Sequence, residues 1–355
     1  MEPKIAILAA STAAVSGLLT GMIRRIAVQG GMIDVPNARS SHTRATPRGG
    51  GAAIVVSSCA AFAVLAYVGL ISAATAASLI GGGALVAGIG LMDDRAAVPA
   101  GIRLAVHAAA AVWALAWLGG FPPVRIGESI VHLGYGGDAF GFLGIVWTLN
   151  LFNFMDGIDG LAASEAIFIA WCAAALGMVL GIGNAADPAA LVFGASCAGF
   201  LLWNWAPARI FLGDVGSGYL GYVIAVLALT TTRSDPVAAW VWLILGGAFF
   251  VDATVTLLRR LARGERAHLA HRSHAYQWVA RRWGHRRATG AVILLNVLWL
   301  LPWAVLAELH RDWAVRILVP ALGGVVCLAL AAGSGRKERR DRCAVPSDSP
   351  GLAGR

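Results

Sequence analysis

Charged side chains are scarce in this chain of 355 residues: Asp, Glu, Lys and Arg together make up 13% of it, whereas hydrophobic residues make up 58%. The mean hydropathy of +0.71 is far above that of a soluble domain of this length. The lack of charge therefore excludes an ordinary soluble protein. It predicts an all-α, polytopic integral membrane protein.

Cysteine is also scarce, and its placement excludes a disulfide framework. Of the five cysteines, Cys59, Cys172, Cys197 and Cys327 lie inside apolar runs and Cys343 lies in the polar C-terminal segment. No pair is placed where an oxidising compartment would make a disulfide useful. The first apolar run lacks the basic start and the small-residue cleavage site of a secretory signal peptide, so we expect it to be retained as a helix.

Apolar runs of spanning length, about 17 to 25 residues each, dominate what is present. Eleven can be placed, near residues 5–23, 52–70, 73–92, 102–119, 139–154, 161–182, 189–205, 218–231, 237–258, 288–309 and 313–332. An odd number places the two termini on opposite sides of the membrane. We expect one transmembrane catalytic domain over residues 1–335, followed by a basic, disordered cytoplasmic tail at 336–355.

The net charge of +9 indicates orientation in the membrane. Most Lys and Arg fall in alternate loops and in the C-terminal segment, and such loops are cytoplasmic by the positive-inside rule. The N-terminus is then periplasmic and the C-terminus cytoplasmic. No basic segment is interleaved with exposed aromatic residues on a soluble domain, so nucleic acid is not an expected partner. The cytoplasmic loops, which carry every polar motif below, are 24–50, 92–101, 155–160, 206–217 and 259–287.

One polar ladder stands out at the end of an apolar run. Asn150, Asn153, Asp156 and Asp159 recur at a spacing of three, which places all of them along one side of a helix if the segment is helical. A carboxylate at or near hydrocarbon depth is costly unless something compensates its charge, and a divalent cation is the simplest compensator. The alternative is an ordinary polar loop, because Asp and Gly are common in turns.

Two further acidic motifs lie on the same side of the membrane. Adjacent carboxylates such as Asp93 and Asp94 repel each other, which suits proton abstraction or metal binding, although an Asp pair that caps a helix is the simpler alternative. Asp214 stands alone in a glycine-rich turn between Gly213 and Gly218. Its flanking apolar residues favour a metal ligand over a surface turn.

Two basic loops complete the pattern. The first carries Arg44 and Arg48 before three glycines, whose backbone N–H groups are free to approach a phosphate; the alternative is a positive-inside loop with a glycine hinge. The second carries His271, Arg272 and His274 in a field of arginines. No Cys or carboxylate completes a zinc site there, so we favour an anion site. A polybasic segment on anionic lipid stays open.

Metal, anion and base candidates on one membrane face suit chemistry on a diphosphate beside the bilayer. In these motifs the chain resembles the polyprenyl-phosphate N-acetylhexosamine-1-phosphate transferases. This superfamily, glycosyltransferase family 4, includes the phospho-MurNAc-pentapeptide translocase. The resemblance spans residues 34–277 and rests on Pro47-Arg-Gly-Gly50, Asp93-Asp94, the Asn150–Gly160 ladder, Phe211-x-Gly-Asp-Val-Gly-Ser217 and the late His loop.

The resemblance implies that a sugar 1-phosphate passes from a UDP-N-acetyl sugar to undecaprenyl phosphate with release of UMP. It implies Mg²⁺ as cofactor, with Mn²⁺ as a substitute, in the bacterial inner membrane with the active site facing the cytoplasm. Asp214 would be the main metal ligand together with Asp156, and Asp93 and Asp94 would contact or deprotonate the lipid phosphate. A homodimer stays open.

The remaining site residues follow from the same resemblance. Asn153, Asp156 and Asp159 would form the wall of the nucleotide and diphosphate site. Asn204 and Phe211 would hold the uracil ring, and His271 and His274 would contact the diphosphate. Further candidates for substrate binding are Asn150, Arg44, Arg48 and Arg272. The catalytic candidates are the two histidines and four of the carboxylates, namely His271, His274, Asp93, Asp94, Asp156 and Asp159.

The late loop departs from one branch of the superfamily. The peptidoglycan enzyme has three consecutive His residues, whereas this chain reads His271-Arg-Ser-His-Ala-Tyr-Gln277. That form is closer to the O-antigen-initiating branch, which uses N-acetylhexosamines or their 6-deoxy forms. A GlcNAc-1-phosphate transferase for another envelope glycan stays open. A transporter is the competing class, but its charges would lie at the midplane between repeats, and no repeat is seen.

Overall fold

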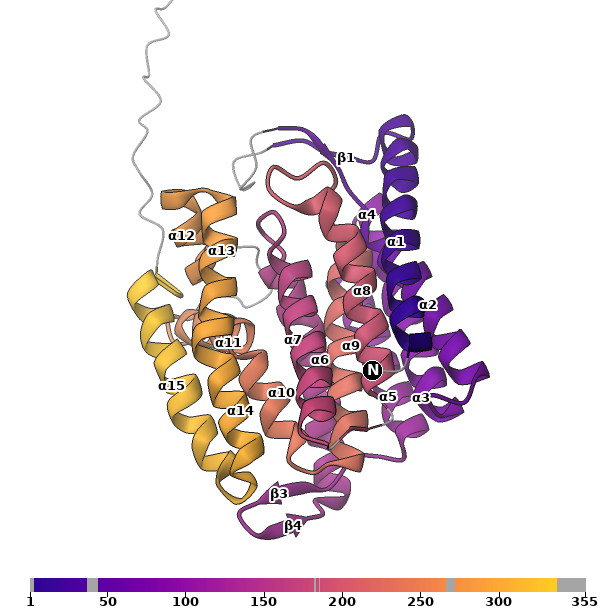
Figure 1. Cartoon of the computed structure of the whole chain (residues 1–355). Coiled ribbons are helices and arrows are strands. Elements are labelled where there is room, and N and C mark those ends of the chain that lie inside the picture. Colours follow the sequence, from indigo (N-terminus) through magenta and orange to yellow (C-terminus); the bar gives the residue numbers. More distant parts are fainter. Residues whose placement is uncertain (1–2, 37–43, 182, 185, 266–271, 337–355) are drawn as a thin grey trace, which may run out of the picture.

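The computed structural model describes residues 3–36, 44–181, 183–184, 186–265 and 272–336. Apolar runs become helices here because lipid offers the backbone no hydrogen-bond partners. The helices, shown in Figure 1, are α1 (Pro3–Gln29), α2 (Gly51–Tyr67), α3 (Ala73–Ala77), α4 (Gly83–Arg95), α5 (Ala100–Leu118), α6 (Gly134–Met155), α7 (Leu161–Val179), α8 (Asp187–Asn204), α9 (Asp214–Ser234), α10 (Ala238–Leu245), α11 (Gly247–Leu261), α12 (Ala275–Trp283), α13 (His285–Leu295), α14 (Leu301–Leu309) and α15 (Ala314–Ala332).

Three short turns of other helix types join these elements. The π-helical turn η1 (Ser78–Gly82) joins α3 to α4, and a second, η2 (Asn296–Leu300), joins α13 to α14. The 3₁₀ turn η3 (Arg311–Trp313) precedes α15. The helices on either side of each π-helical turn therefore form one continuous segment.

Every one of the eleven predicted apolar runs is helical, and the prediction of a polytopic membrane protein is confirmed. Among the described residues, eight helical segments are long and apolar enough to cross a membrane. The pair α10 and α11 would add a ninth, but it is bent by 71° at Gly246. Helix α2 has only 17 residues, and α8 has polar residues at both ends. The count of eleven spans thus stays a prediction.

Two small antiparallel hairpins correct the all-α prediction. Strands β1 (Ile33–Asp34) and β2 (Thr46–Pro47) pair in the first polar loop, and β3 (Val124–Ile126) pairs with β4 (Ser129–Val131). Between β3 and β4 the chain turns over two residues, with Gly127 at φ +62°, a conformation that glycine adopts at no steric cost. Strands this short give too weak a periodic signal to be seen among long apolar runs.

The polar loops gather at one end of the bundle. The ends of α4, α6 and α8 meet the starts of α2, α7 and α9 there, close to β1 and α12, while the β3–β4 hairpin lies at the opposite end (Figure 1). Both α1 and α15 end on the polar side, since Arg24 donates to the Arg209 carbonyl at 3.1 Å and the Gly335 N–H donates to the Ser273 carbonyl. With an odd number of crossings, the first and the last helix must cross the membrane in the same direction and therefore end on the same side. Which side of the membrane this end faces stays a prediction.

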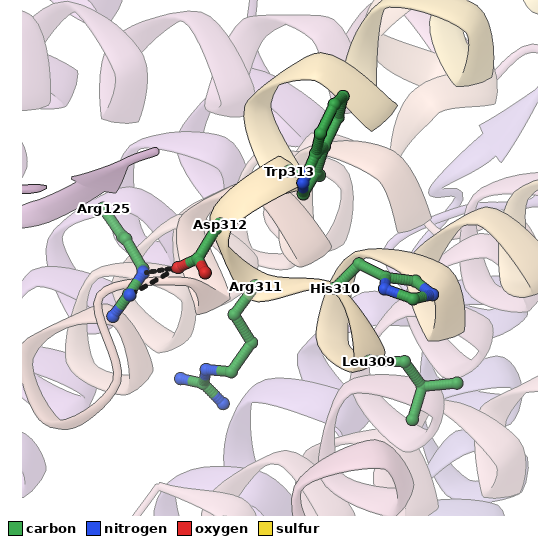
Figure 2. Close-up of a pocket in the computed structure, with 6 residues that line it drawn as sticks. All are labelled: Arg125, Leu309, His310, Arg311, Asp312 and Trp313. Carbon is green, nitrogen blue, oxygen red and sulfur yellow. Dashed lines mark hydrogen bonds and ion pairs between the residues drawn. The ribbon is translucent and has the colours of Figure 1, made fainter. Parts of the chain in front are cut away.

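The opposite end is held by charges. Figure 2 shows Arg125 of β3 paired with Asp312 of η3, which ties the hairpin to the connection between α14 and α15. Arg311 binds Asp235 and, at 3.2 Å, Glu308. These residues border a shallow cavity of about 460 Å³ lined by Arg125, Leu309, His310, Arg311, Asp312 and Trp313. Each of these arginines has a carboxylate partner, so the cluster serves to close this end of the bundle.

Helix α9 lies at the centre of the molecule. Nearly every residue from Val215 to Leu227 is buried, against α4 on one side and α6 on the other. Its N-terminus is held by the first polar loop, because the N–H groups of Gly50 and Gly51 donate to the carbonyls of Phe211 and Leu212 at 2.9 and 2.8 Å. These two N–H groups were expected to approach a phosphate. That expectation is wrong for them, because they are used to hold α9.

The contact between the loop and α9 leaves no room for a side chain at Gly51. A Cβ atom there would lie 2.2 Å from the Gly216 Cα atom, so the two backbones touch directly. Gly51→Ala should lower the free energy of unfolding by about 1–3 kcal/mol, the usual cost of overpacking. Thermal unfolding in detergent would measure the loss.

Gly88→Ala is the matched control, because Gly88 also lies in a membrane helix but a Cβ atom there would meet nothing within 4 Å. This control should be neutral or slightly stabilising, since alanine is the better helix former. Equal melting temperatures for the two variants would show that the close contact at Gly51 is not needed.

Candidate active site

Four aspartates from three helix ends meet at the polar end of the bundle. Asp93 and Asp94 close α4, Asp156 follows α6 directly, and Asp214 begins α9. The carboxyl groups of Asp93 and Asp214 are neighbours, since one Arg103 nitrogen lies 2.6 Å from the first and 3.8 Å from the second. Burial, and then the charges of Asp214, Asp94 and Asp159, raise the pKa of the Asp156 carboxyl to about 8. The structure thus brings together four of the predicted acidic site residues.

Asp94 holds the start of α9. It is buried, and its two carboxylate oxygens accept the N–H groups of Asp214 and Val215, each at 3.0 Å. Arg48 donates to the Asp94 carbonyl, and its Nε lies 3.9 Å from the Asp94 carboxylate. A carboxylate at a helix N-terminus is stabilised both by these N–H groups and by the helix dipole. The capping role weighed for this pair therefore exists at Asp94, but on a helix that is distant in sequence.

Asp93 is held on both of its oxygens, which accept the Val98 N–H and the Arg103 guanidinium, each at 2.6 Å. Arg103 also lies 3.8 Å from the Asp214 carboxylate, and about a third of its side chain is exposed. Arg103 is not among the site residues predicted from the sequence. The available signal was that it is the only Asp, Glu, Lys or Arg residue of α5, an otherwise apolar membrane helix.

The Asn150–Gly160 ladder is not one continuous helix. Helix α6 ends at Met155, so only Asn150 and Asn153 lie on it, and the prediction that the four polar residues share one helical face is wrong. The Asn153 amide donates to the Asp214 carboxylate and to the Ser217 hydroxyl, both at 3.0 Å. Asn150 donates instead to the Val146 carbonyl of its own helix. After Asp159 the chain turns at Gly160, whose φ is +74°, and then enters α7.

Asp159 joins three segments of the chain. Its carboxylate accepts the Ala208 N–H at 3.0 Å and lies 3.1 Å from His285 Nδ1, and its carbonyl accepts the Thr289 hydroxyl at 2.9 Å. It borders a surface cavity of about 810 Å³ whose lining is Asp159, Trp205, Ala206, Pro207, Trp283, Gly284, His285, Arg286, Arg287 and Gly290. The structure therefore places Asp159 beside the other carboxylates but binds it to α13.

Asn204 and Phe211 both hold neighbouring loops through hydrogen bonds, Asn204 with its side-chain amide and Phe211 with its backbone N–H. The Asn204 side chain is buried, accepts the Gly160 N–H at 3.0 Å and donates to the Ile210 carbonyl at 2.9 Å. Phe211 is half-buried, and its N–H donates to the Pro47 carbonyl. The amide of Asn204 thus fixes two loops.

The basic candidates are more scattered. His274 is buried at the start of α12, 3.7 Å from Asp252 and stacked on Tyr276, so the structure does not place it among the four aspartates. Tyr276 donates its hydroxyl to the Phe154 carbonyl at 3.0 Å, which anchors α12 beside Asp156. Arg44 is exposed, and Arg272 precedes α12. His271 lies outside the described residues.

The segment that carries the four aspartates is similar to a known protein family. Residues 76–232, which contain all four aspartates, match the family described as glycosyl transferase family 4. This segment belongs to glycosyl transferase family 4. The family resemblance inferred from the motifs is therefore confirmed.

Sequence similarity to curated relatives extends beyond the segment 76–232. The chain is 29% identical over 273 residues to a probable undecaprenyl-phosphate N-acetylglucosaminyl 1-phosphate transferase of Bacillus subtilis, covering 73% of this chain and 74% of that protein. It is 27% identical over 330 residues to the decaprenyl-phosphate N-acetylglucosaminephosphotransferase of Mycobacterium tuberculosis H37Rv, covering 84% and 80%. A phospho-N-acetylmuramoyl-pentapeptide-transferase of Moorella thermoacetica is 33% identical over 185 residues, covering 48% and 56%.

The raised pKa of Asp156 predicts how stability depends on pH. Because the folded protein holds this proton up to about pH 8, whereas the unfolded chain releases it near the ordinary value of 3.8, stability should fall as the pH rises between these values. The slope is at most about 1.4 kcal/mol per pH unit. Melting temperatures in detergent with EDTA, from pH 5.5 to 8.5, would show it.

Asp156→Asn should flatten this dependence, because an amide has no proton to lose. Glu128→Gln, in the exposed turn of the β3–β4 hairpin, removes a carboxylate far from the cluster and should leave the slope as in the wild type. A slope that survives in Asp156→Asn would assign the titration to another group.

Proposed function

We propose that this protein transfers a sugar 1-phosphate from a UDP-N-acetylhexosamine to undecaprenyl phosphate, releasing UMP. The reaction would take place at the cytoplasmic face of the bacterial inner membrane and begin the synthesis of a cell-surface polysaccharide. The observation that carries this proposal is the meeting of Asp93, Asp94, Asp156 and Asp214 at one end of a membrane bundle, beside two arginines. The names of the relatives, which are polyprenyl-phosphate transferases, support the same reaction.

The residues present fit a magnesium ion. Asp93 and Asp214 both lie beside one Arg103 nitrogen, and neighbouring carboxylates need a proton or a cation to offset their repulsion. Within the described part of the chain no three His, Cys, Asp or Glu residues form a ready-made metal site. Mg²⁺ is commonly held by only one or two carboxylates together with substrate phosphates, so Asp214 and Asp156 would suffice. When bound, the ion would neutralise charge on the diphosphate.

The chain's own residues would then divide the chemistry. An oxygen of the lipid phosphate attacks the phosphorus that bears the sugar, and the bond from this phosphorus to the UMP oxygen breaks. Asp93 would accept the proton that the lipid phosphate loses, or steer that phosphate, with Arg103 holding the carboxylate and facing the phosphate oxygens. Asp94 and Asn153 would keep Asp214 in place through the start of α9.

The sugar is a finer part of the proposal. The His271–Gln277 loop resembles the O-antigen-initiating branch, which favours an N-acetylhexosamine or its 6-deoxy form as the donor. The names of the relatives favour a second candidate, a GlcNAc-1-phosphate transferase for another envelope glycan. Both candidates use the same carboxylates and differ in the donor. A panel of UDP-sugars offered to the purified protein would separate them.

UMP release from a UDP-sugar, with undecaprenyl phosphate in proteoliposomes, is the experiment that tests the proposal. We expect release that requires both the lipid and a divalent cation and that stops with EDTA. A transporter would bind or move a solute without producing UMP. No UMP from any UDP-N-acetyl sugar, by protein that remains folded, would contradict the proposed function.

Removing the charge of Asp214 or Asp93 should have different effects. Asp214→Asn should cost several orders of magnitude in activity and abolish the metal-dependent part of UDP-sugar binding, because the cation loses its main ligand. Asp93→Asn should leave that binding nearly intact and lower kcat. Calorimetric titration with and without Mg²⁺ measures the binding.

The division of roles would be reversed if Asp214→Asn kept wild-type metal-dependent binding while Asp93→Asn lost it. Asp312→Asn, at the opposite end of the bundle, serves as the control and should retain both binding and activity.

A further inference from the structure

A stripe of polar residues runs along one face of the apolar helical segment formed by α13 and η2. His285, Thr289 and Asn296 are spaced by four and seven residues, which places them on the same side of a helix. We call these three residues the α13 polar stripe. The opposite side of the same segment carries Leu294 and Leu298, which are 59% and 70% exposed, as expected for residues that face lipid.

Each member of the stripe contacts a polar partner on the chain that follows α6. His285 Nδ1 lies 3.1 Å from the Asp159 carboxylate, and the Thr289 hydroxyl donates to the Asp159 carbonyl at 2.9 Å. Further along the helix, the Asn296 amide donates to the Glu165 carboxyl of α7 at 2.6 Å. The stripe therefore follows the chain from the loop after Asp156 into the first turns of α7.

The contacts are buried at a depth where polar groups are costly. Thr289, Asn296 and Glu165 are each 1% exposed. A polar group removed from water and lipid costs free energy unless it is hydrogen-bonded, so each of these partners specifies one docking position of α13. Apolar packing alone would tolerate a shift along the helix, whereas three matched polar contacts do not.

The loop that the stripe holds carries Asp156. This residue lies outside any helix, and within the described residues its carboxyl accepts no hydrogen bond, so its position depends on the rest of the loop. Three residues later, Asp159 provides the contacts to Thr289 and His285. Moving Asp159 would move Asp156 relative to Asp214.

We propose that the α13 polar stripe positions the loop 156–160 for phosphoryl transfer, so that His285, Thr289 and Asn296 are positioning residues of the site. The inference rests on the proposed function and adds residues to it. They act through Asp159, near the end of the loop, and through Glu165 of α7, the helix that follows it.

Thr289→Val tests the proposal with little change of shape, because it exchanges only the hydroxyl for a methyl group. We expect kcat for UMP release to fall about 10-fold, the value of one hydrogen bond. The KM for the UDP-sugar should change less than about 2-fold, and the Mg²⁺ concentration for half-maximal activity should rise. Thr289→Ser should restore wild-type values, because it keeps the donor.

Thr230→Val is the matched control, because its hydroxyl donates at 2.8 Å to the Val226 carbonyl of its own helix. It should leave kcat and the Mg²⁺ requirement unchanged. Wild-type kcat in Thr289→Val, or no recovery in Thr289→Ser, would overturn the proposed role of the stripe while leaving the proposed function intact.

A readout independent of activity keeps the two proposals separate. Hydrogen–deuterium exchange of peptides that cover residues 156–160 should be faster in Thr289→Val than in the wild type and Thr230→Val. Unchanged exchange in this loop would contradict the positioning role, even if the wild-type protein released no UMP and the proposed function failed on its own.

Discussion

The site depends on one interaction, in which the Asp94 carboxylate accepts the first two N–H groups of α9. In addition to these bonds to Asp214 and Val215, the N–H groups of Gly50 and Gly51 donate to the carbonyls of the two residues at positions 211 and 212, just before α9. Together these contacts hold the start of a buried central helix against α4 and against the first polar loop. Because Asp214 is the first residue of α9, fixing this end also fixes its carboxyl beside Asp93.

Collecting acidic groups at the end of a membrane bundle is unfavourable, and the surrounding structure offsets the cost. Arg103 neutralises Asp93 and Asn153 donates to Asp214, while burial, together with the neighbouring carboxylates, raises the pKa of the Asp156 carboxyl to about 8. A protein gains nothing in stability from such an arrangement. The cation and the anionic substrate proposed for this site would account for it.

Apolar runs and the shared face of the polar motifs could be predicted from the sequence, because hydropathy and positive charge are summed over many residues. Partners distant along the chain could not. Nothing near Asp94 shows that it caps α9, and nothing near Asn204 shows that its amide joins Gly160 to Ile210. The even spacing of the Asn150–Gly160 ladder was misleading, because α6 ends at Met155 and the chain turns at glycine. His285 lies in a basic stretch and Thr289 at the start of an apolar one, so neither residue indicates a site from the sequence alone.

The most direct test of the central claim is a structure with Mn²⁺ and a UDP-sugar, in which anomalous scattering locates the metal. The account predicts one Mn²⁺ with an Asp214 carboxylate oxygen and diphosphate oxygens at about 2.1 Å, the distance at which Mg²⁺ takes such ligands, and Asp156 beside them. A metal bound away from the four aspartates, or a diphosphate bound elsewhere on the bundle with no metal, would contradict it.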